Sequence, residues 1–275
     1  MDFGPIDLDH TLSCGQAFRW EMRDGRWRGI VSGHIIEAQV TSGKLELRST
    51  MPERALASYF RADDDYEGII SDIGGRDAYV RELTDRFYGL RLLRQDPWEC
   101  AASYILATYA NVPRIRMMVE RVCRTFGSSL GGEDYAFPTP EQILARSESA
   151  ATCGLGYRCS RFVQFAERVH DGELDLVSLR KASYEECTAE LLKYEGIGSK
   201  VADCVAVFSL DQLAAFPIDV RIGRVLEQRY GTKGSYRKLG AWARDHFGPY
   251  AGYAQEFLYY AEDAKNRREL TRSGS

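Results

Sequence analysis

Polar and apolar residues follow two periods along the chain, first that of strands and then that of helices. Over residues 17–50, short apolar-rich runs are separated by Asp24-Gly25, Ser32-Gly33 and Ser42-Gly43, which are typical of tight hairpin turns. This pattern predicts an antiparallel meander with strands at 17–23, 26–31, 34–40 and 44–48. From Pro52 onward, apolar residues recur at three- and four-residue spacing, as in amphipathic helices.

The helical pattern continues to the end of the chain. Several helix starts carry a capping residue, namely Asp96 before Pro97, Thr139 before Pro140, and Asp219. We expect helices at 53–61, 77–88, 97–109, 112–126, 158–170, 184–194, 201–210 and 251–268, with two more starting at 140 and 219. The fold class is therefore α+β. A small antiparallel β-containing N-terminal domain, residues 1–95, precedes an all-helical body, residues 96–275.

Composition narrows the class of protein only a little. Hydrophobic residues make up 44% of the 275 residues and charged residues 28%, as in an ordinary globular protein. The net charge of −4 does not by itself indicate a nucleic-acid partner, although arginines cluster at 114–124, 158–161 and 221–229. No apolar run approaches the roughly 20 residues of a membrane span, and residues 1–5 do not resemble a signal peptide. We expect no membrane association and a cytoplasmic location, nucleoid-associated if prokaryotic, or a nuclear one if eukaryotic.

The seven cysteines indicate reduced thiols rather than a cofactor site. Their number is odd, they are scattered, and no Cys-x2-Cys pair occurs. We therefore expect no zinc ion, no iron–sulfur cluster and no required cofactor.

The most informative stretch is Glu195–Cys204, EGIGSKVADC. Gly196 and Gly198 separate an amphipathic segment from a nearly continuous apolar one. Such a turn leaves backbone N–H groups uncovered at the start of the second helix, where an anion such as phosphate is favoured. Lys200 places an amine in the first turn of that helix, where the macrodipole disfavours a positive charge. From the residues alone, Lys200 is either a solvated or phosphate-neutralising lysine, or a reactive amine.

This stretch, followed later by Pro217-Ile218-Asp219-Val220, resembles the helix–hairpin–helix DNA glycosylase superfamily with its Gly/Pro-Asp segment. Within the superfamily it is most similar to the 8-oxoguanine DNA glycosylase branch. Four further segments match that branch in order: GQAFRW at 15–20, LLRQDP at 92–97, LGYR at 155–158 and AGYAQ at 251–255. The resemblance implies a monomeric bifunctional enzyme of base excision repair. It would flip 8-oxoguanine, paired with cytosine, out of duplex DNA, excise it, and cut the strand by β-elimination.

The resemblance further implies that Lys200 is the nucleophile, which attacks C1′ of the deoxyribose and forms a Schiff base. Burial and the helix N-terminus both favour the neutral amine that this attack needs. Asp219 would stabilise the positive charge that develops on the sugar and would help to orient the lysine. Without the resemblance, Asp219 is an ordinary helix N-cap.

Five residues are implied to surround the extruded base. Gln255 and Tyr259 lie four apart on one face of the last helix, where the amide would recognise the Watson–Crick edge and the ring would stack on the base. Cys204 would close the pocket from the opposite side, and the backbone carbonyl of Gly15 would accept the N7–H of 8-oxoguanine. Pro217 completes the base-binding set. Taken alone, these residue types are equally typical of a buried cysteine, a core aromatic and a turn glycine.

Further residues are implied to contact the DNA around the vacated position. Arg114, Tyr157 and Arg158 match residues that hold the orphaned cytosine and wedge into the gap. From the residues alone, surface arginines and a core tyrosine are the alternative. Tyr109 stands where the eukaryotic family has an asparagine that fills the vacated slot, so a stacking plug is expected there in place of an amide.

Two positions depart from the family together. Arg221 replaces a histidine beside the catalytic aspartate, and Glu262 replaces an aspartate on the last helix. We expect the changes to compensate each other through an Arg221–Glu262 ion pair, with Arg221 among the DNA-contacting residues.

The hairpin itself is implied to bind the phosphate 3′ to the lesion through backbone N–H groups. The resemblance also implies a structural cation, because main-chain carbonyls are suitable ligands for hard cations. The N–H groups belong to Gly196, Gly198 and Val201, and the carbonyls to Leu192, Tyr194 and Ile197.

Two alternatives remain. A monofunctional glycosylase of the alkylated-base branch uses water and the aspartate only, and has no lysine at the position of Lys200. A non-catalytic helix–hairpin–helix DNA-binding module needs the glycines but has no use for Lys200, Asp219 and Gln255 together.

Overall fold

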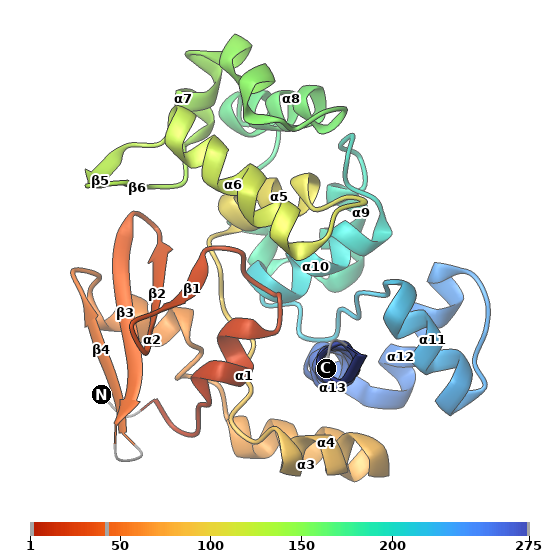
Figure 1. The fold of residues 1–275 in the computed structure, drawn as a ribbon. Coiled ribbons are helices and arrows are strands. Elements are labelled where there is room, and N and C mark those ends of the chain that lie inside the picture. Colours follow the sequence, from red (N-terminus) through yellow and green to blue (C-terminus); the bar gives the residue numbers. More distant parts are fainter. Residues whose placement is uncertain (1–2, 42–43, 274–275) are drawn as a thin grey trace.

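The computed structural model describes residues 3–41 and 44–273. Its N-terminal part contains a four-stranded antiparallel sheet in the order β1-β2-β3-β4 (Figure 1), with β1 Trp20–Arg23, β2 Arg26–Val31, β3 His34–Thr41 and β4 Lys44–Ser49. Asp24-Gly25 and Ser32-Gly33 have positive φ at both positions, which is the turn conformation that matches strand twist. The predicted meander is confirmed, and its third turn, at Ser42-Gly43, lies outside the described residues.

The sheet has a small hydrophobic core of its own. Buried and half-buried residues alternate along β2, as expected of a strand with one covered face. Trp20 on β1 is 1% exposed, and its indole N–H donates to the Tyr59 hydroxyl at 2.7 Å, at the end of α2 (Glu53–Tyr59). Leu8 and Leu12 of α1 (Leu8–Ser13) join the same core.

The rest of the chain is a helical body around a second, larger core (Figure 1). Its helices are α3 Tyr66–Arg76, α4 Ala78–Arg86, α5 Pro97–Leu106, α6 Val112–Phe126, α7 Pro140–Leu144, α8 Arg158–His170, α9 Tyr184–Leu191, α10 Ser199–Ser209, α11 Val220–Tyr230, α12 Tyr236–Phe247 and α13 Ala251–Ser273. Short 3-10 segments lie at Ser147–Cys153, Ser178–Lys181 and Gly248–Tyr250. Helices α3 and α4 pack against α13, so residues before 95 contribute to the core of the helical body. The α+β class is confirmed.

Several helices and one hairpin were not predicted from the sequence. Helix α3 contains three glycines in YEGIISDIGGR, which lowers its intrinsic helix propensity, yet burial of Tyr66, Ile69 and Ile73 in the larger core holds it. Helices α1 and α12 were likewise not predicted. A two-stranded hairpin, β5 Ser129–Gly131 and β6 Asp134–Tyr135, occupies part of the stretch expected to be a loop.

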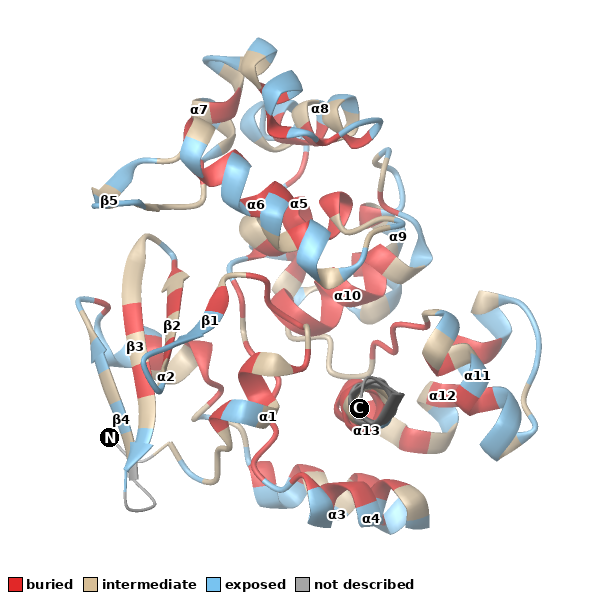
Figure 2. Cartoon of the chain, in the orientation of Figure 1, coloured by how far each residue is buried: buried red, intermediate tan, exposed pale blue. Residues whose placement is uncertain are grey.

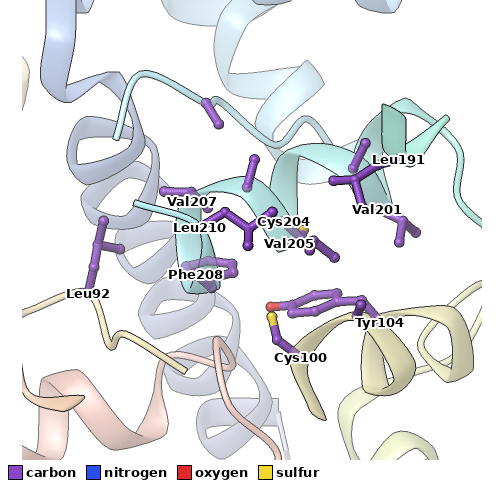
Figure 3. Packing of buried hydrophobic residues seen from close by; sticks show 14 of the residues in the cluster. Leu92, Cys100, Tyr104, Leu191, Val201, Cys204, Val205, Val207, Phe208 and Leu210 are labelled. Carbon is purple, nitrogen blue, oxygen red and sulfur yellow. The ribbon is translucent and has the colours of Figure 1, made fainter. Parts of the chain in front are cut away.

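Helix α10 lies at the centre of the helical body, and every residue from Val201 to Leu210 is buried (Figure 2). Figure 3 shows Cys100 and Tyr104 of α5 facing this helix. The Tyr104 ring stacks on Phe208 of α10, with ring centroids 5.8 Å apart. The second helix of the predicted hairpin is therefore anchored on several sides, and only its N-terminus is open to an outside ligand.

Gly252, in the first turn of α13, allows that helix to approach α10 closely. A Cβ atom at this position would lie 2.4 Å from Cγ2 of Val207 and 2.9 Å from the carbonyl oxygens of Leu213 and Ala215. The Gly252 N–H donates to the Leu213 carbonyl at 2.8 Å. Only glycine fits here without a shift of backbone.

The thiols are shielded and unpaired. All seven cysteines are free, and all except Cys159 are buried. Burial raises the pKa of the thiols of Cys14, Cys100, Cys123, Cys187 and Cys204. In the described part of the chain, no helix is long and apolar enough to cross a membrane.

We predict that Gly252→Ala lowers the free energy of unfolding by about 1–3 kcal/mol, because the added methyl group overpacks the α10–α13 contact. Gly75→Ala is the matched control. Gly75 is an exposed helical glycine, and a Cβ atom added to it would meet nothing within 4 Å, so this variant should be neutral or stabilised by up to about 1 kcal/mol. Urea unfolding measures both; equal stabilities of the two variants would contradict the prediction.

Candidate active site

Helices α9 and α10 form the helix–hairpin–helix that the glycines predict. Gly196 has φ +95°, and a Cβ there would lie 3.3 Å from Ile105 and 3.4 Å from Arg161. Gly198 is the N-cap of α10, with no side-chain hydrogen bond to the helix and nothing within 4 Å of its Cβ position. The first N–H groups of α10 therefore have no side-chain cap, and an anion can approach them.

Lys200 is the second residue of α10 and is half-buried. Its Nζ atom lies 5.1 Å from the centroid of the Tyr104 ring, and its charge acts on the Cys204 thiol one turn further along. Burial raises the pKa of that thiol to about 11, although the positive charge of Lys200 opposes the shift. The Cys204 thiol, one turn from Lys200, is therefore neutral.

Asp219 is the N-cap of α11, and its carboxylate accepts a hydrogen bond from the Ile222 N–H at 2.8 Å. The cap fixes the direction of the side chain, so the capping and the charge-stabilising roles are compatible. Pro217, two residues earlier, is buried.

A polar network that the sequence analysis missed ties the segment before Asp219 to α10. The buried carboxylate of Asp203, on α10, accepts hydrogen bonds from the hydroxyls of Tyr184 at 2.7 Å and Tyr236 at 2.6 Å. The Tyr236 hydroxyl also accepts from the Ile218 N–H at 3.3 Å. Burial raises the pKa of Asp203, and the two tyrosine donors oppose that shift. Asp203 lies within the Glu195–Cys204 stretch, but its partners come from other elements and no local pattern marks them.

The base-contacting residues lie on α13 and beside it. Gln255 is 4% exposed, and within the described residues its Oε1 atom has no hydrogen-bond partner. Gly15 has φ +95°, and a Cβ there would lie 3.9 Å from Cε1 of Tyr259. Gly15 and Tyr259, far apart in the sequence, are therefore neighbours, and the Gln255 amide still has bonding capacity for a ligand.

The predicted Arg221–Glu262 ion pair is wrong. Arg221 pairs instead with Asp263, Nη1 to Oδ1 at 2.9 Å, and the same Nη1 lies 3.4 Å from the Tyr259 hydroxyl. Glu262 forms an ion pair with Lys265. Tyr259 and Asp263 are four apart and share a helix face, whereas Glu262 points about 100° away from Asp263. The carboxylate that pairs with Arg221 is thus that of Asp263, the residue after Glu262.

The residues expected to contact the opposite strand occupy one corner. Tyr109 is 97% exposed and has φ +51°. Tyr157 is exposed and donates its hydroxyl to the Thr108 carbonyl at 3.0 Å. Arg158 is buried, and donates from Nε to the Thr108 carbonyl at 2.9 Å and from Nη2 to that of Tyr109 at 3.3 Å. Arg158 thus holds the segment that presents Tyr109, and the exposed cation at this corner is Arg114.

The hairpin also contains the carbonyls at which a cation was expected. The Tyr194 carbonyl accepts from the Ile197 N–H at 3.1 Å, which leaves a second lone pair on that oxygen. Over the described residues, no group of three or more His, Cys, Asp or Glu side chains is arranged to hold a metal ion. Main-chain oxygens are therefore the ligands that the described part of the chain offers.

Comparison with known proteins agrees with this geometry. Residues 2–101 match the family described as 8-oxoguanine DNA glycosylase, N-terminal domain. The N-glycosylase/DNA lyase OGG1 of Arabidopsis thaliana is 31% identical, over 94% of this chain and 80% of that protein. The N-glycosylase/DNA lyase of Saccharomyces cerevisiae is 29% identical, over 93% and 83%. The Clostridium acetobutylicum 8-oxoguanine glycosylase/lyase, solved with double-stranded DNA containing cytosine opposite 8-oxoG, superposes with a TM-score of 0.89 at 28% identity, covering 95% and 93% of the two chains.

The fold is that of a DNA glycosylase that also has lyase activity and binds DNA. The chain belongs to the 8-oxoguanine DNA glycosylase family of DNA-repair enzymes.

We predict that Tyr236→Phe slows base excision roughly ten- to hundredfold, because the segment that carries Asp219 loses its bond to α10 and small displacements of catalytic groups are costly. It should also destabilise the fold by about 1–3 kcal/mol, since Asp203 loses a donor. Tyr88→Phe is the control, because its hydroxyl is on the surface. Single-turnover excision and urea unfolding test both effects; a normal excision rate would show that the network does not position Asp219.

Proposed function

We propose that this glycosylase and lyase excises 8-oxoguanine opposite cytosine and then cuts the strand through a Schiff base on Lys200. One observation carries the proposal. A half-buried lysine in the first turn of α10 lies beside the Tyr104 ring of α5. Its charge and that of the capping Asp219 both act on Glu256, which follows the Gln255 amide on α13. Neither a water-dependent glycosylase nor a non-catalytic hairpin requires that lysine.

The chemistry follows from these positions. Once the nucleotide is flipped out of the stack, the neutral Lys200 amine attacks C1′ and the base departs. Asp219 faces the positive charge that develops on the sugar. The covalent adduct rearranges to a Schiff base, which acidifies the C2′ hydrogen, and loss of that hydrogen expels the 3′ phosphate.

Recognition of the oxidised base is assigned to two opposite sides of the pocket. The Gln255 amide, which has spare bonding capacity, serves the Watson–Crick edge, and the Gly15 carbonyl accepts the N7–H that distinguishes 8-oxoguanine from guanine. The Tyr259 ring stacks on the base from beside Gly15. Its hydroxyl lies 3.4 Å from Nη1 of Arg221, whose guanidinium lies over the ring at 5.3 Å from the centroid, so the hydroxyl has a partner.

The hairpin and the Tyr109 corner hold the DNA on either side of the flipped nucleotide. The uncapped N–H groups at the start of α10 bind the phosphate 3′ to the lesion, with the carbonyls of Leu192, Tyr194 and Ile197 offered to a structural cation. Tyr109 plugs the vacated slot, and Arg114 and Tyr157 support the orphaned cytosine. We further propose that the enzyme works as a monomer on chromosomal DNA, in the nucleoid or the nucleus.

We predict that wild-type protein, incubated with duplex containing 8-oxoguanine opposite cytosine and then with borohydride, gives a covalent protein–DNA adduct. Lys200→Gln should abolish the adduct, because the amide nitrogen is not nucleophilic. Lys233→Gln is the control, since Lys233 is an exposed lysine paired with Glu227 and its loss should leave the yield unchanged. An undiminished adduct with Lys200→Gln would exclude the lysine mechanism.

We predict that Tyr109→Asn changes the preference for the base opposite the lesion, because an amide replaces a stacking ring in the slot. Asparagine tolerates the positive φ of this position, so the fold should be retained. Tyr109→Phe keeps the ring and should behave like wild type. Excision rates opposite cytosine, adenine and thymine measure the preference; identical ratios in wild type and Tyr109→Asn would show that Tyr109 does not fill the slot.

A further inference from the structure

Glu256 is a buried carboxyl group within the site that the mechanism above leaves unused. It follows Gln255 on α13 and is 2% exposed, and its Oε1 atom has no hydrogen-bond partner among the residues that the structure describes. A buried polar group without a partner costs about 1–3 kcal/mol, and more if charged. A buried carboxyl group that carries this cost indicates a functional role.

The surroundings of Glu256 bring together the reactive groups of the site. The Cys14 thiol, next to Gly15, donates its hydrogen bond to the Thr11 carbonyl at 3.1 Å. The same thiol and the charges of Lys200 and Asp219 all act on the Glu256 carboxyl. Three further titratable side chains interact with Glu256 from α5, α10 and α13, namely Tyr104, Cys204 and Tyr259. Lys200 is the one cation in this set, so the charge that favours an ionised Glu256 is that of the proposed nucleophile.

Burial raises the pKa of the Glu256 carboxyl to about 7, although the Cys14 thiol and the Lys200 charge oppose the shift. The negative charge of Asp219 adds to it. Asp219 is a helix N-cap with a backbone N–H donor, an environment that suits a carboxylate. Two neighbouring carboxyl groups are thus placed in different environments, a pattern that separates a charged role from a proton-carrying one.

We propose that Glu256 accepts the proton that Lys200 must lose before it attacks the sugar, and that it acts on the reaction through Lys200 as a positioning and proton-holding residue. The inference rests on the proposed role of Lys200. The step is a single proton transfer, in which the Lys200 ammonium and the Glu256 carboxylate become a neutral amine and a neutral carboxylic acid. No other reactant takes part.

The physical driving force is the removal of water. In bulk water the charged pair is strongly preferred, because the pKa values of an amine and a carboxyl group differ by about six units. In a dry site both charges lose their hydration, whereas the neutral pair does not. Glu256 is already buried, so a flipped nucleotide that fills the pocket removes water mainly from the half-buried Lys200. Binding of the substrate therefore favours the nucleophilic form of the lysine.

The test measures the rate of borohydride-trapped adduct formation between pH 5.5 and 9, on duplex with a pre-formed abasic site opposite cytosine. The rate of the wild-type enzyme should rise with pH up to about pH 7, because Glu256 loses its own proton and can then accept one, and should level off above that pH. Glu256→Gln should be roughly ten- to hundredfold slower at pH 7. Its rate should keep rising by about tenfold per pH unit toward the pKa of an ordinary lysine.

A second variant acts on Glu256 without altering it. Cys14→Ala removes a thiol whose interaction lowers the pKa of the carboxyl, so the bend in the profile should move to higher pH. Thermal unfolding and affinity for duplex with a tetrahydrofuran abasic analogue show whether each variant is folded and binds. If Glu256→Gln does not fold, the direction of the Cys14→Ala shift decides: an unmoved bend overturns the proposal.

Three other outcomes would also overturn the proposal. If Glu256 only held Lys200 as an ammonium, Glu256→Gln would be faster than wild type at pH 7, and that result overturns the proposal. An unchanged pH profile in Glu256→Gln also overturns it and leaves the lysine mechanism intact. Absence of any adduct with wild type at every pH overturns both the inference and the proposed function on which it rests.

Discussion

The contact between α10 and α13 at Gly252 fixes the distance between the site residues on these two helices. Lys200 comes from the first turn of α10, whereas Gln255, Glu256 and Tyr259 come from α13, so neither helix holds the site alone. The carbonyls of Leu213 and Ala215 press against the same glycine, and the chain that leaves α10 toward Asp219 is thereby aligned on α13 as well. The residues of the site come from segments that are distant in the sequence, so their relative positions depend on close packing between those segments. Gly252 permits that packing, because its lack of a side chain lets the backbone of α13 contact the backbone at Leu213 and Ala215.

Local features of the sequence were sufficient where the chemistry is local. The glycine pair, the lysine in the first turn of α10 and the aspartate cap follow from residue types at neighbouring positions, and the two described turns of the meander follow from Asp-Gly and Ser-Gly. Features set by tertiary packing were not predictable. Tyr236 reaches Asp203 over 33 residues, and Glu256 follows Gln255 in α13 without any sign in the sequence of what surrounds it. The partner of Arg221 was missed by one residue, since one step along a helix turns a side chain by about 100°.

The departures from the family pattern are supported by their surroundings. Arg221 stands where the family pattern has a histidine. Its guanidinium donates to Asp263 and to the Tyr259 hydroxyl. At the other corner, Tyr109 adopts a left-handed backbone conformation that is uncommon for a tyrosine. The guanidinium of Arg158 and the hydroxyl of Tyr157 bind the carbonyls of this segment, which offsets the strain and keeps the ring directed outward.

The shielding of the thiols has a consequence for when the enzyme can act. Oxidants attack thiolates far faster than thiols, and they reach exposed sulfur first. Here six of the seven sulfurs are buried, and burial raises the pKa of Cys204 beside the nucleophile to about 11. The same chemical conditions that turn guanine into a lesion would inactivate a repair enzyme with a reactive cysteine in its pocket. Because the thiol beside Lys200 is neutral and covered, we expect this protein to resist inactivation by oxidants better than an enzyme with an exposed thiolate in its pocket.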